Sequence, residues 1–289
     1  MKAAAGPLLP FLVLALALAG VSFGSIFVRL AAAPALAIAL WRMTLASAVV
    51  VPAALAAGGG ARRATARDWS LAAAAGGLLA LHFGTWITSL QFTTVAASVL
   101  LVNTAPVFVA LLMWLIGQRP GPRTWLAVAL GLAGAVVIAA PAGSGHGSLL
   151  GNLLAVGGAI AMAAYLMLAR EAQRGLPYLP YVAVAYGTAA AVLWVAVLWS
   201  GTAWWGFSPQ TWAALAAMAA VSQLVGHGGY NWSLRHLHPA FVSIALTGEP
   251  VLASLLAWWL LNEPLTLRVV AGGALVLAAI WVAARPAGR

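Results

Sequence analysis

Long runs of apolar residues, separated by short polar connections, make up almost the entire chain. A helix needs about 20 apolar residues to cross the hydrocarbon core of a bilayer. The runs between prolines, glycines and charged residues predict ten such helices, at residues 7–28, 35–57, 69–90, 93–117, 123–141, 148–169, 178–200, 209–233, 239–261 and 265–284. The runs are rich in Ala and Leu and do not alternate between polar and apolar positions, as barrel strands would. We therefore expect an all-α, polytopic membrane protein with ten transmembrane helices.

The first run has an alternative interpretation. Its apolar stretch from Leu8 to Val21, followed by small residues, is also typical of a secretory signal peptide. Only Lys2 precedes this stretch, whereas signal peptides begin with a more basic segment. We therefore interpret the first run as a transmembrane helix.

The composition excludes a soluble globular protein. Charged residues make up 6% of the 289 residues, against roughly 25% in soluble chains, and hydrophobic residues make up 64%, too many for a disordered chain. The formal net charge is +10, but the basic residues occur in short clusters between the apolar runs, so we expect the lipid bilayer and no nucleic acid as the partner. The chain has no cysteine, which excludes disulfides, Cys-ligated zinc and iron–sulfur clusters, and we expect no metal and no cofactor.

The distribution of Lys and Arg predicts that both termini lie in the cytoplasm, because cytoplasmic loops carry more of these residues. In that orientation only Arg29 and Arg268 lie at outer ends, and Arg42 lies within the second run. Eleven basic residues lie on the cytoplasmic side: Lys2, Arg62, Arg63, Arg67, Arg119, Arg123, Arg170, Arg174, Arg235, Arg285 and Arg289. The bias also favours an even number of spans.

An internal repeat relates the two halves of the chain, which we divide into residues 1–143 and 144–289. Residues 84–120 align without a gap on residues 228–264, so that Pro106, Pro120 and Trp114 meet identical residues in the second segment. The shift passes five predicted spans, an odd number, so the two copies cross the membrane in opposite directions. Two inverted five-helix repeats are typical of alternating-access transporters with a site near the midplane. A channel built by duplication is the alternative.

Several motifs resemble those of a known family. They are Gly24-Ser25-Ile26-Phe27, Arg42, Asn103-Thr104-Ala105-Pro106, Glu249-Pro250 and Asn262-Glu263-Pro264. With them, the whole chain resembles EamA-type members of the drug/metabolite transporter superfamily, and within that group it is most similar to YddG-like aromatic amino-acid exporters. The resemblance implies a central cavity, a bacterial inner (plasma) membrane, and export of aromatic and other neutral amino acids or related metabolites. The chain departs from the usual pattern at Gln118, where the first copy commonly carries an acid, which puts a symmetric pair of acids in doubt.

Polar side chains within the apolar runs are the candidate substrate-binding residues, since each needs a partner or a wet cavity. The run at 209–233 places Gln223, His227, Tyr230 and Asn231 on one helix face, which indicates a cavity lining. Hydrogen bonding between packed helices is the alternative interpretation.

Aromatic side chains add three candidates to this set. His82 and Trp86 share a face of the third run, and Trp86 aligns with Tyr230 in the repeat. An aromatic pair of this kind suits a flat, apolar substrate, although anchoring of Trp86 at the bilayer surface is the alternative. Tyr165 of the sixth run is also expected to face the cavity.

Two prolines are the candidate hinges. Pro106 and Pro250 lie in the middle of their runs, where proline removes a helical hydrogen bond and kinks the helix. Asn103 and Thr247 occupy equivalent positions beside them and are expected to contact substrate. The alternative is static curvature, since proline is frequent in membrane helices.

Glu249 is the only carboxylate deep within the apolar runs. Arg42 is its natural partner, and we expect a structural ion pair, because a buried charge needs a counter-charge. A proton-coupling role for Glu249 is the alternative. Arg29 is a second candidate partner, or a ligand for a substrate carboxylate.

Phosphate-binding loops and nucleophile–base pairs are absent from the sequence, so we expect neither an ATP-driven pump nor an enzyme. The prediction is a monomeric exporter that moves a small-molecule substrate, an amino acid or similar metabolite, by alternating access. The alternatives are a drug or cationic-metabolite efflux carrier and, less favoured, a membrane-embedded lipid-modifying enzyme.

Overall fold

The computed structural model describes residues 8–57, 64–93, 95–139, 148–261 and 267–285. These residues form helices and their connections and contain no strand, which confirms the all-helical prediction for the described part of the chain. The helices of the first half are α1 (Leu9–Ser22), α2 (Gly24–Leu30), α3 (Ala35–Ala56), α4 (Ala66–Phe92), α5 (Val95–Val102), α6 (Ala105–Leu115) and α7 (Pro122–Ala139). Those of the second half are α8 (Leu149–Gly175), α9 (Tyr178–Ser200), α10 (Pro209–Ala217), the π-helix η1 (Met218–His227), α11 (Gly228–Ser233), α12 (Pro239–Leu246), α13 (Glu249–Leu261) and α14 (Leu267–Ala284).

Every predicted apolar run overlaps one of these helices or a succession of them. Seven helical segments in the described part of the chain are long and apolar enough to cross a bilayer, and two shorter apolar helices, Pro122–Val137 and Pro239–Leu252, accompany them. The segment α10–η1–α11 is not among the seven because polar residues lower its hydropathy. The chain is therefore a polytopic helical membrane protein, and the number of ten spans stays a prediction.

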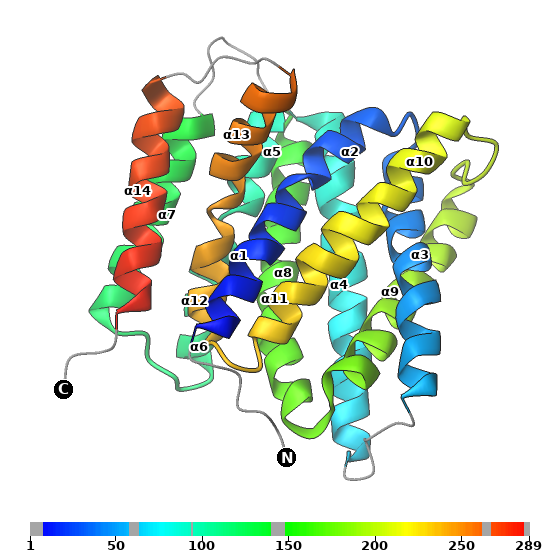
Figure 1. The fold of residues 1–289 in the computed structure, drawn as a ribbon, viewed down its shortest axis with the longest axis horizontal. Helices are drawn as coiled ribbons and strands as arrows, with labels where there is room; N and C mark the ends of the chain where they lie inside the picture. Colours follow the sequence, from blue (N-terminus) through cyan, green and yellow to red (C-terminus); the bar gives the residue numbers. More distant parts are fainter. Residues whose placement is uncertain (1–7, 58–63, 94, 140–147, 262–266, 286–289) are drawn as a thin grey trace.

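The helices pack into one bundle with α4 and α8 alongside each other in the middle (Figure 1). The pair α3 and α9 lies on one side, the pair α7 and α14 lies on the other, and α1 packs alongside η1 and α11 (Figure 1). Small residues permit these close approaches, as is usual between membrane helices. A Cβ atom on Gly134 of α7, for example, would lie 2.6 Å from the carbonyl oxygen of Gly272 in α14.

Polar residues at the helix starts explain where several helices begin. Thr65 and Asp68 form a capping box at α4, in which the Asp68 carboxylate accepts from the Thr65 N–H at 2.8 Å. Ser148 and Ser208 cap α8 and α10 by accepting from the backbone N–H of Gly151 and Thr211. These caps satisfy N–H groups that otherwise lack a partner.

Two spans are broken at equivalent positions. A two-residue turn separates α5 from α6, and another separates α12 from α13. Pro106 and Pro250 are the second residues of the new helices α6 and α13. This corrects the expectation of a kink within a continuous helix: each proline begins a new helix, where its missing N–H costs nothing. The last residues of α5 and α12, Val102 and Leu246, lie four positions before the prolines, so their carbonyls have lost the usual helical donor.

Candidate functional site

A hollow inside the bundle collects polar side chains from both halves of the chain. Its cavity volume is about 60 Å³, and the surrounding empty space, including its opening, is about 600 Å³. Its polar lining consists of Arg42, His82, Trp86, Asn103, His227, Tyr230, Ser243 and Glu249. The walls are close together, so a substrate of amino-acid size needs them to separate.

Arg42 of α3 is the most buried charge in this lining, with 2% of its surface exposed. Its Nε donates to Oε1 of Gln223 at 2.7 Å, and its Nη2 donates to the carbonyl oxygen of Ser222 at 3.4 Å. Its Cζ also lies 4.1 Å from the centroid of the Phe83 ring, within the range of a cation–π interaction. These contacts hold the guanidinium in one orientation at the cavity wall.

The π-helix η1 supplies both hydrogen-bond acceptors of Arg42. Such wide turns are rare and are frequently found at functional sites. Within η1, Ser222 presents its main-chain carbonyl and Gln223 its side chain to the guanidinium, while His227 at the end of η1 reaches the cavity. A Cβ on Gly226 would lie 2.8 Å from Cγ1 of Val21 in α1, so the absence of a side chain there allows η1 to approach α1. This π-helix was not predicted from the sequence.

Glu249 lines the same cavity as Arg42. It is the first residue of α13, where the helix dipole favours a negative charge, and its main-chain carbonyl accepts from the Ser22 hydroxyl at 3.4 Å. No ion pair joins the described side chains of Arg42 and Glu249, and Arg42 donates to Gln223 and Ser222 instead. The expected pairing of these two charges stays a prediction.

Aromatic rings form one wall of the cavity. The rings of His82 and Trp86 are stacked, with centroids 5.9 Å apart and planes 12° apart. His82 Nδ1 is bonded to the carbonyl oxygen of Gly158 at 2.9 Å, which makes Nδ1 the donor. His227 and Tyr230 are hydrogen-bonded to each other through Nδ1 and the hydroxyl group. The buried Nε1 of Trp86 has no hydrogen-bond partner among the described residues, which leaves one donor at this wall unsatisfied.

The helix breaks contribute a second wall. Val102, Asn103 and Pro106 come from the first break, and Leu246 and Glu249 come from the second. Asn103 Nδ2 donates to the carbonyl of its own helix at Val99, at 2.9 Å. The two breaks therefore bring to the cavity main chain whose carbonyls lack the usual helical donor, a feature of transporter sites built from discontinuous helices.

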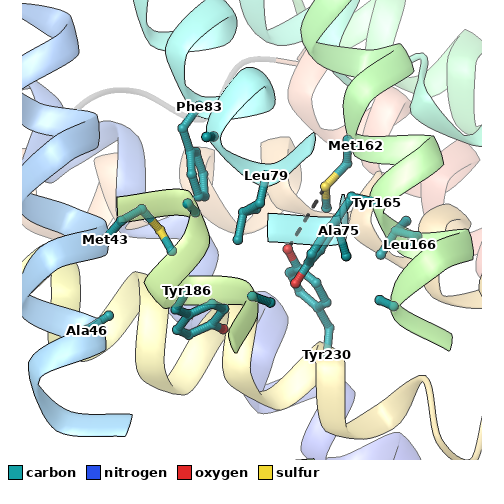
Figure 2. Close-up of a cluster of buried hydrophobic side chains, with 14 of the residues drawn as sticks. Met43, Ala46, Ala75, Leu79, Phe83, Met162, Tyr165, Leu166, Tyr186 and Tyr230 are labelled. Carbon is teal, nitrogen blue, oxygen red and sulfur yellow. Dashed lines mark hydrogen bonds between the residues drawn. The ribbon is translucent and has the colours of Figure 1, made fainter. Parts of the chain in front are cut away.

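Four candidate substrate-binding residues do not lie in the lining. Tyr165 is fully buried in the packed cluster that also contains Tyr230, whose hydroxyl points towards Met162 (Figure 2). Gln223 accepts from Arg42 through its Oε1. Thr247 donates to the carbonyl of Ile244, and Asn231 Nδ2 donates to the Tyr186 hydroxyl at 3.4 Å. The substrate-binding roles of these four, and the hinge role of Pro250, which is buried outside the lining, stay predictions.

The sequence reading also missed most of the apolar lining. Beyond Pro106, the apolar residues are Val21, Val102, Ala105, Met162, Leu166 and Leu246. Apolar residues carry no distinguishing signal in a chain this hydrophobic, because their exposure to the cavity depends on how each helix is rotated in the bundle.

A second, wider hollow of about 1240 Å³, including open space, lies at the end of the bundle where α8 ends and α12 begins. Its charged lining is Arg67, Arg170, Glu171 and Arg174, with His238 beside them. Glu171 pairs with Arg174 at 2.7 Å and lies 3.7 Å from Arg67, whereas Arg170 donates to the carbonyls of Leu234 and Leu237. The lining carries three arginines against one carboxylate, so this hollow is strongly basic. Among the described residues, no group of three or more His, Asp or Glu side chains is arranged to hold a metal ion.

Comparisons with known proteins agree with this architecture. An uncharacterized transporter of Archaeoglobus fulgidus is 26% identical over 208 residues, which cover 71% of this chain and 73% of the relative. A crystal structure of a protein with 20% sequence identity matches with a TM-score of 0.81 over 95% of this chain and 97% of the other, a likeness of fold alone. The model of the EamA-like transporter family matches residues 8–140 and 149–285. The chain therefore belongs to the EamA-like transporter family.

Proposed function

We propose that this transporter exports neutral amino acids, aromatic ones among them, or related small metabolites by alternating access. In this proposal ten helices form two inverted five-helix repeats, residues 1–143 and 144–289, around a cavity near the membrane midplane. The protein acts as a monomer in a bacterial inner membrane with both termini in the cytoplasm. The observation that carries the proposal is the cavity lined by a guanidinium from one half and a carboxylate from the other, Arg42 and Glu249.

The pattern of helix packing supports the inverted repeat. If the halves are exchanged, α1 with α2 takes the place of α8, α3 that of α9, and α4 that of α10–η1–α11. The contact of α4 with α8 then becomes the contact of η1 and α11 with α1, and the contact of α4 with α9 becomes that of η1 with α3. The pairs α3–α9 and α7–α14 map onto themselves. All of these contacts are present, as a two-fold axis between the halves requires, and one family model matches both halves.

The basic hollow supports a cytoplasmic entrance. It shares α6, α8 and α12 with the central cavity, and the proposed topology places its arginines on the cytoplasmic side. A cleft of one sign of charge raises the local concentration of oppositely charged groups. Arg67, Arg170 and Arg174 would therefore attract the carboxylate end of an amino acid before it reaches the cavity.

The test is transport in vesicles reconstituted with the purified protein. We expect labelled phenylalanine and leucine to enter these vesicles faster than they enter protein-free vesicles. The uptake rate should saturate as the substrate concentration rises. The expected direction is down the substrate gradient, because the chain has no ATP-binding motif. If neither amino acid enters the protein-containing vesicles faster than the protein-free vesicles, the proposed substrate class is wrong.

One observation favours a second candidate, a carrier for organic cations. The Glu249 side chain lines the cavity and has no hydrogen-bond partner among the described residues, as a binding site for a cation requires. The same vesicles loaded with labelled methyl viologen test this function. Transport of this permanent dication, blocked by a water-soluble reagent that modifies Glu249, would replace the amino-acid proposal.

The helix breaks give a further prediction about the mechanism. Replacing Pro106 or Pro250 with alanine should slow flux several-fold but change substrate affinity by less than about twofold, because alanine restores an N–H that can join the two helix segments. Pro52→Ala is the matched control, since Pro52 lies inside the continuous helix α3, and its flux should stay normal. Flux and equilibrium binding are both measured for each variant. Normal flux in both Pro106→Ala and Pro250→Ala would show that the breaks are not hinges.

A further inference from the structure

We infer that the cavity recognises its substrate as a zwitterion, with Arg42 binding the carboxylate and Glu249 binding the ammonium group of one α-amino acid. This assignment rests on the proposed function and goes beyond it, because it gives the two charges separate roles. It also replaces the expected direct pairing of Arg42 with Glu249 by a pairing that the substrate completes.

Arg42 is arranged to bind an anion from the cavity. Its Nε and Nη2 are engaged by Gln223 and by the carbonyl of Ser222, whereas Nη1 has no hydrogen-bond partner among the described residues. A Cβ on Gly24 would lie 4.0 Å from Nη1, an ordinary contact distance, so even an alanine at this position of α2 would not crowd this nitrogen. Two fixed contacts and one free nitrogen leave the guanidinium oriented and able to donate to a carboxylate.

Glu249 is arranged to bind a cation. Its carboxylate lines the cavity without a hydrogen-bond partner among the described residues. Leu246, three residues earlier, also lines the cavity, and Pro250 deprives its carbonyl of the helical donor. An ammonium group has three donors, so a carboxylate and a freed carbonyl together satisfy two of them.

The two charges together decide the class of substrate. A simple amine would neutralise Glu249 and leave Arg42 uncompensated in the protein interior, and a simple carboxylic acid would do the reverse. A buried charge without a counter-charge is costly, so each single-charge ligand should bind much more weakly than the zwitterion. The rest of the substrate meets Trp86, Met162 and Leu166, which suits an uncharged side chain.

The experiment compares matched ligands that differ by one charge. Phenylalanine, 2-phenylethylamine and 3-phenylpropionate compete for binding of labelled phenylalanine to the purified full-length protein, and leucine with its amine and acid analogues forms a second series. With the unaltered protein, each single-charge analogue should bind at least about 30-fold more weakly than its amino acid. Single-charge analogues that bind as tightly as the amino acid would overturn the assignment.

Variants then assign each charge to its residue. In Glu249→Gln, the acid analogue should bind about as tightly as the amino acid, while the amine stays weak. Arg42→Gln should give the opposite pattern, with the amine binding about as tightly as the amino acid. If Arg42→Gln does not fold, Arg42→Lys takes its place; because it keeps the positive charge, it should keep the unaltered order of the three ligands. A merely structural role would weaken all three ligands equally, and that result would overturn the assignment.

The transport assay distinguishes a failure of the zwitterion assignment from a failure of the proposed function. Flux of amino acids without this crossed pattern would overturn the zwitterion assignment and leave the proposed function standing. Absence of both flux and binding for both amino acids would overturn the proposed function and the assignment together.

Discussion

Replacing Gly76 with alanine should prevent the bundle from assembling, although alanine is the better helix former. Gly76 lies in α4 where this helix packs against α9, and a Cβ there would lie 2.4 Å from the carbonyl oxygen of Ala185 and 2.8 Å from Cβ of Thr188. Neither atom belongs to the flexible end of a side chain, so the clash forces the two backbones apart. Because α8 packs along α4 as well, α4 cannot shift without disturbing a second interface. We expect a loss of at least about 3 kcal/mol of folding free energy.

The adjacent glycine provides the control. A Cβ on Gly77 meets no atom within 4 Å, so Gly77→Ala should be neutral or stabilise the protein by up to about 1 kcal/mol through helix propensity. The yield of monodisperse protein in detergent and its thermal midpoint measure both variants. If Gly76→Ala were as stable as Gly77→Ala, the close contact between α4 and α9 would be wrong.

Replacing Arg42 with methionine should have the second largest effect on stability. The methionine fills a similar volume but leaves Oε1 of Gln223 and the carbonyl of Ser222 without their donor, and it removes the cation from the Phe83 ring. Hydrogen bonds to charged groups contribute about 1.5–3 kcal/mol each, so we expect a loss of about 3 kcal/mol. The thermal midpoint in detergent should fall by about 6–12 °C.

Two further variants test this explanation. Arg174→Met removes a charge that is 66% exposed and pairs at the surface, so its midpoint should hardly change. Adding Gln223→Leu to Arg42→Met should restore part of the lost stability, because replacing both partners removes the unsatisfied acceptor. If the losses of folding free energy in the two single variants simply add in the double variant, Arg42 and Gln223 do not stabilise each other, and the explanation is wrong.

Transport variants and stability variants answer different questions at Arg42. The stability series reports how η1 holds the guanidinium, whereas the ligand series reports what the guanidinium binds. An Arg42→Lys protein that still binds the amino acid more tightly than the amine would separate the two roles, because lysine keeps the charge without the guanidinium geometry.

The amino-acid sequence alone predicted the helical segments closely. The apolar runs at 35–57 and 178–200 correspond to α3 and α9 within one residue at each end, and the run at 239–261 corresponds to α12 and α13 together. This succeeded because hydrophobic length and the positions of Pro, Gly and charge are local properties, and in lipid each segment must satisfy its own backbone hydrogen bonds. Pro106 and Pro250 also marked the two helix breaks, since a missing N–H acts on the carbonyl four residues earlier.

The sequence predicted the candidate site less completely. It selected Arg42, His82, Trp86, His227 and Glu249, all of which line the cavity, because ionisable and aromatic groups within apolar runs are conspicuous. It also selected Tyr165 and Asn231, which lie in packed surroundings. Helical periodicity indicates which residues share a face but not what that face meets.

Only the tertiary structure decided how each helix is rotated and what each charge contacts. The partner of Arg42 is Gln223, 181 positions away, in a π-helix whose i→i+5 hydrogen bonds leave no pattern in composition. The rotation of α1 against η1 follows from the contact at Gly20, where a Cβ would lie 2.9 Å from the carbonyl oxygen of Val221. The sequence by itself determined the helices, because helix formation is local; the packing of small residues between distant segments determined the cavity, because that packing exists only in the assembled bundle.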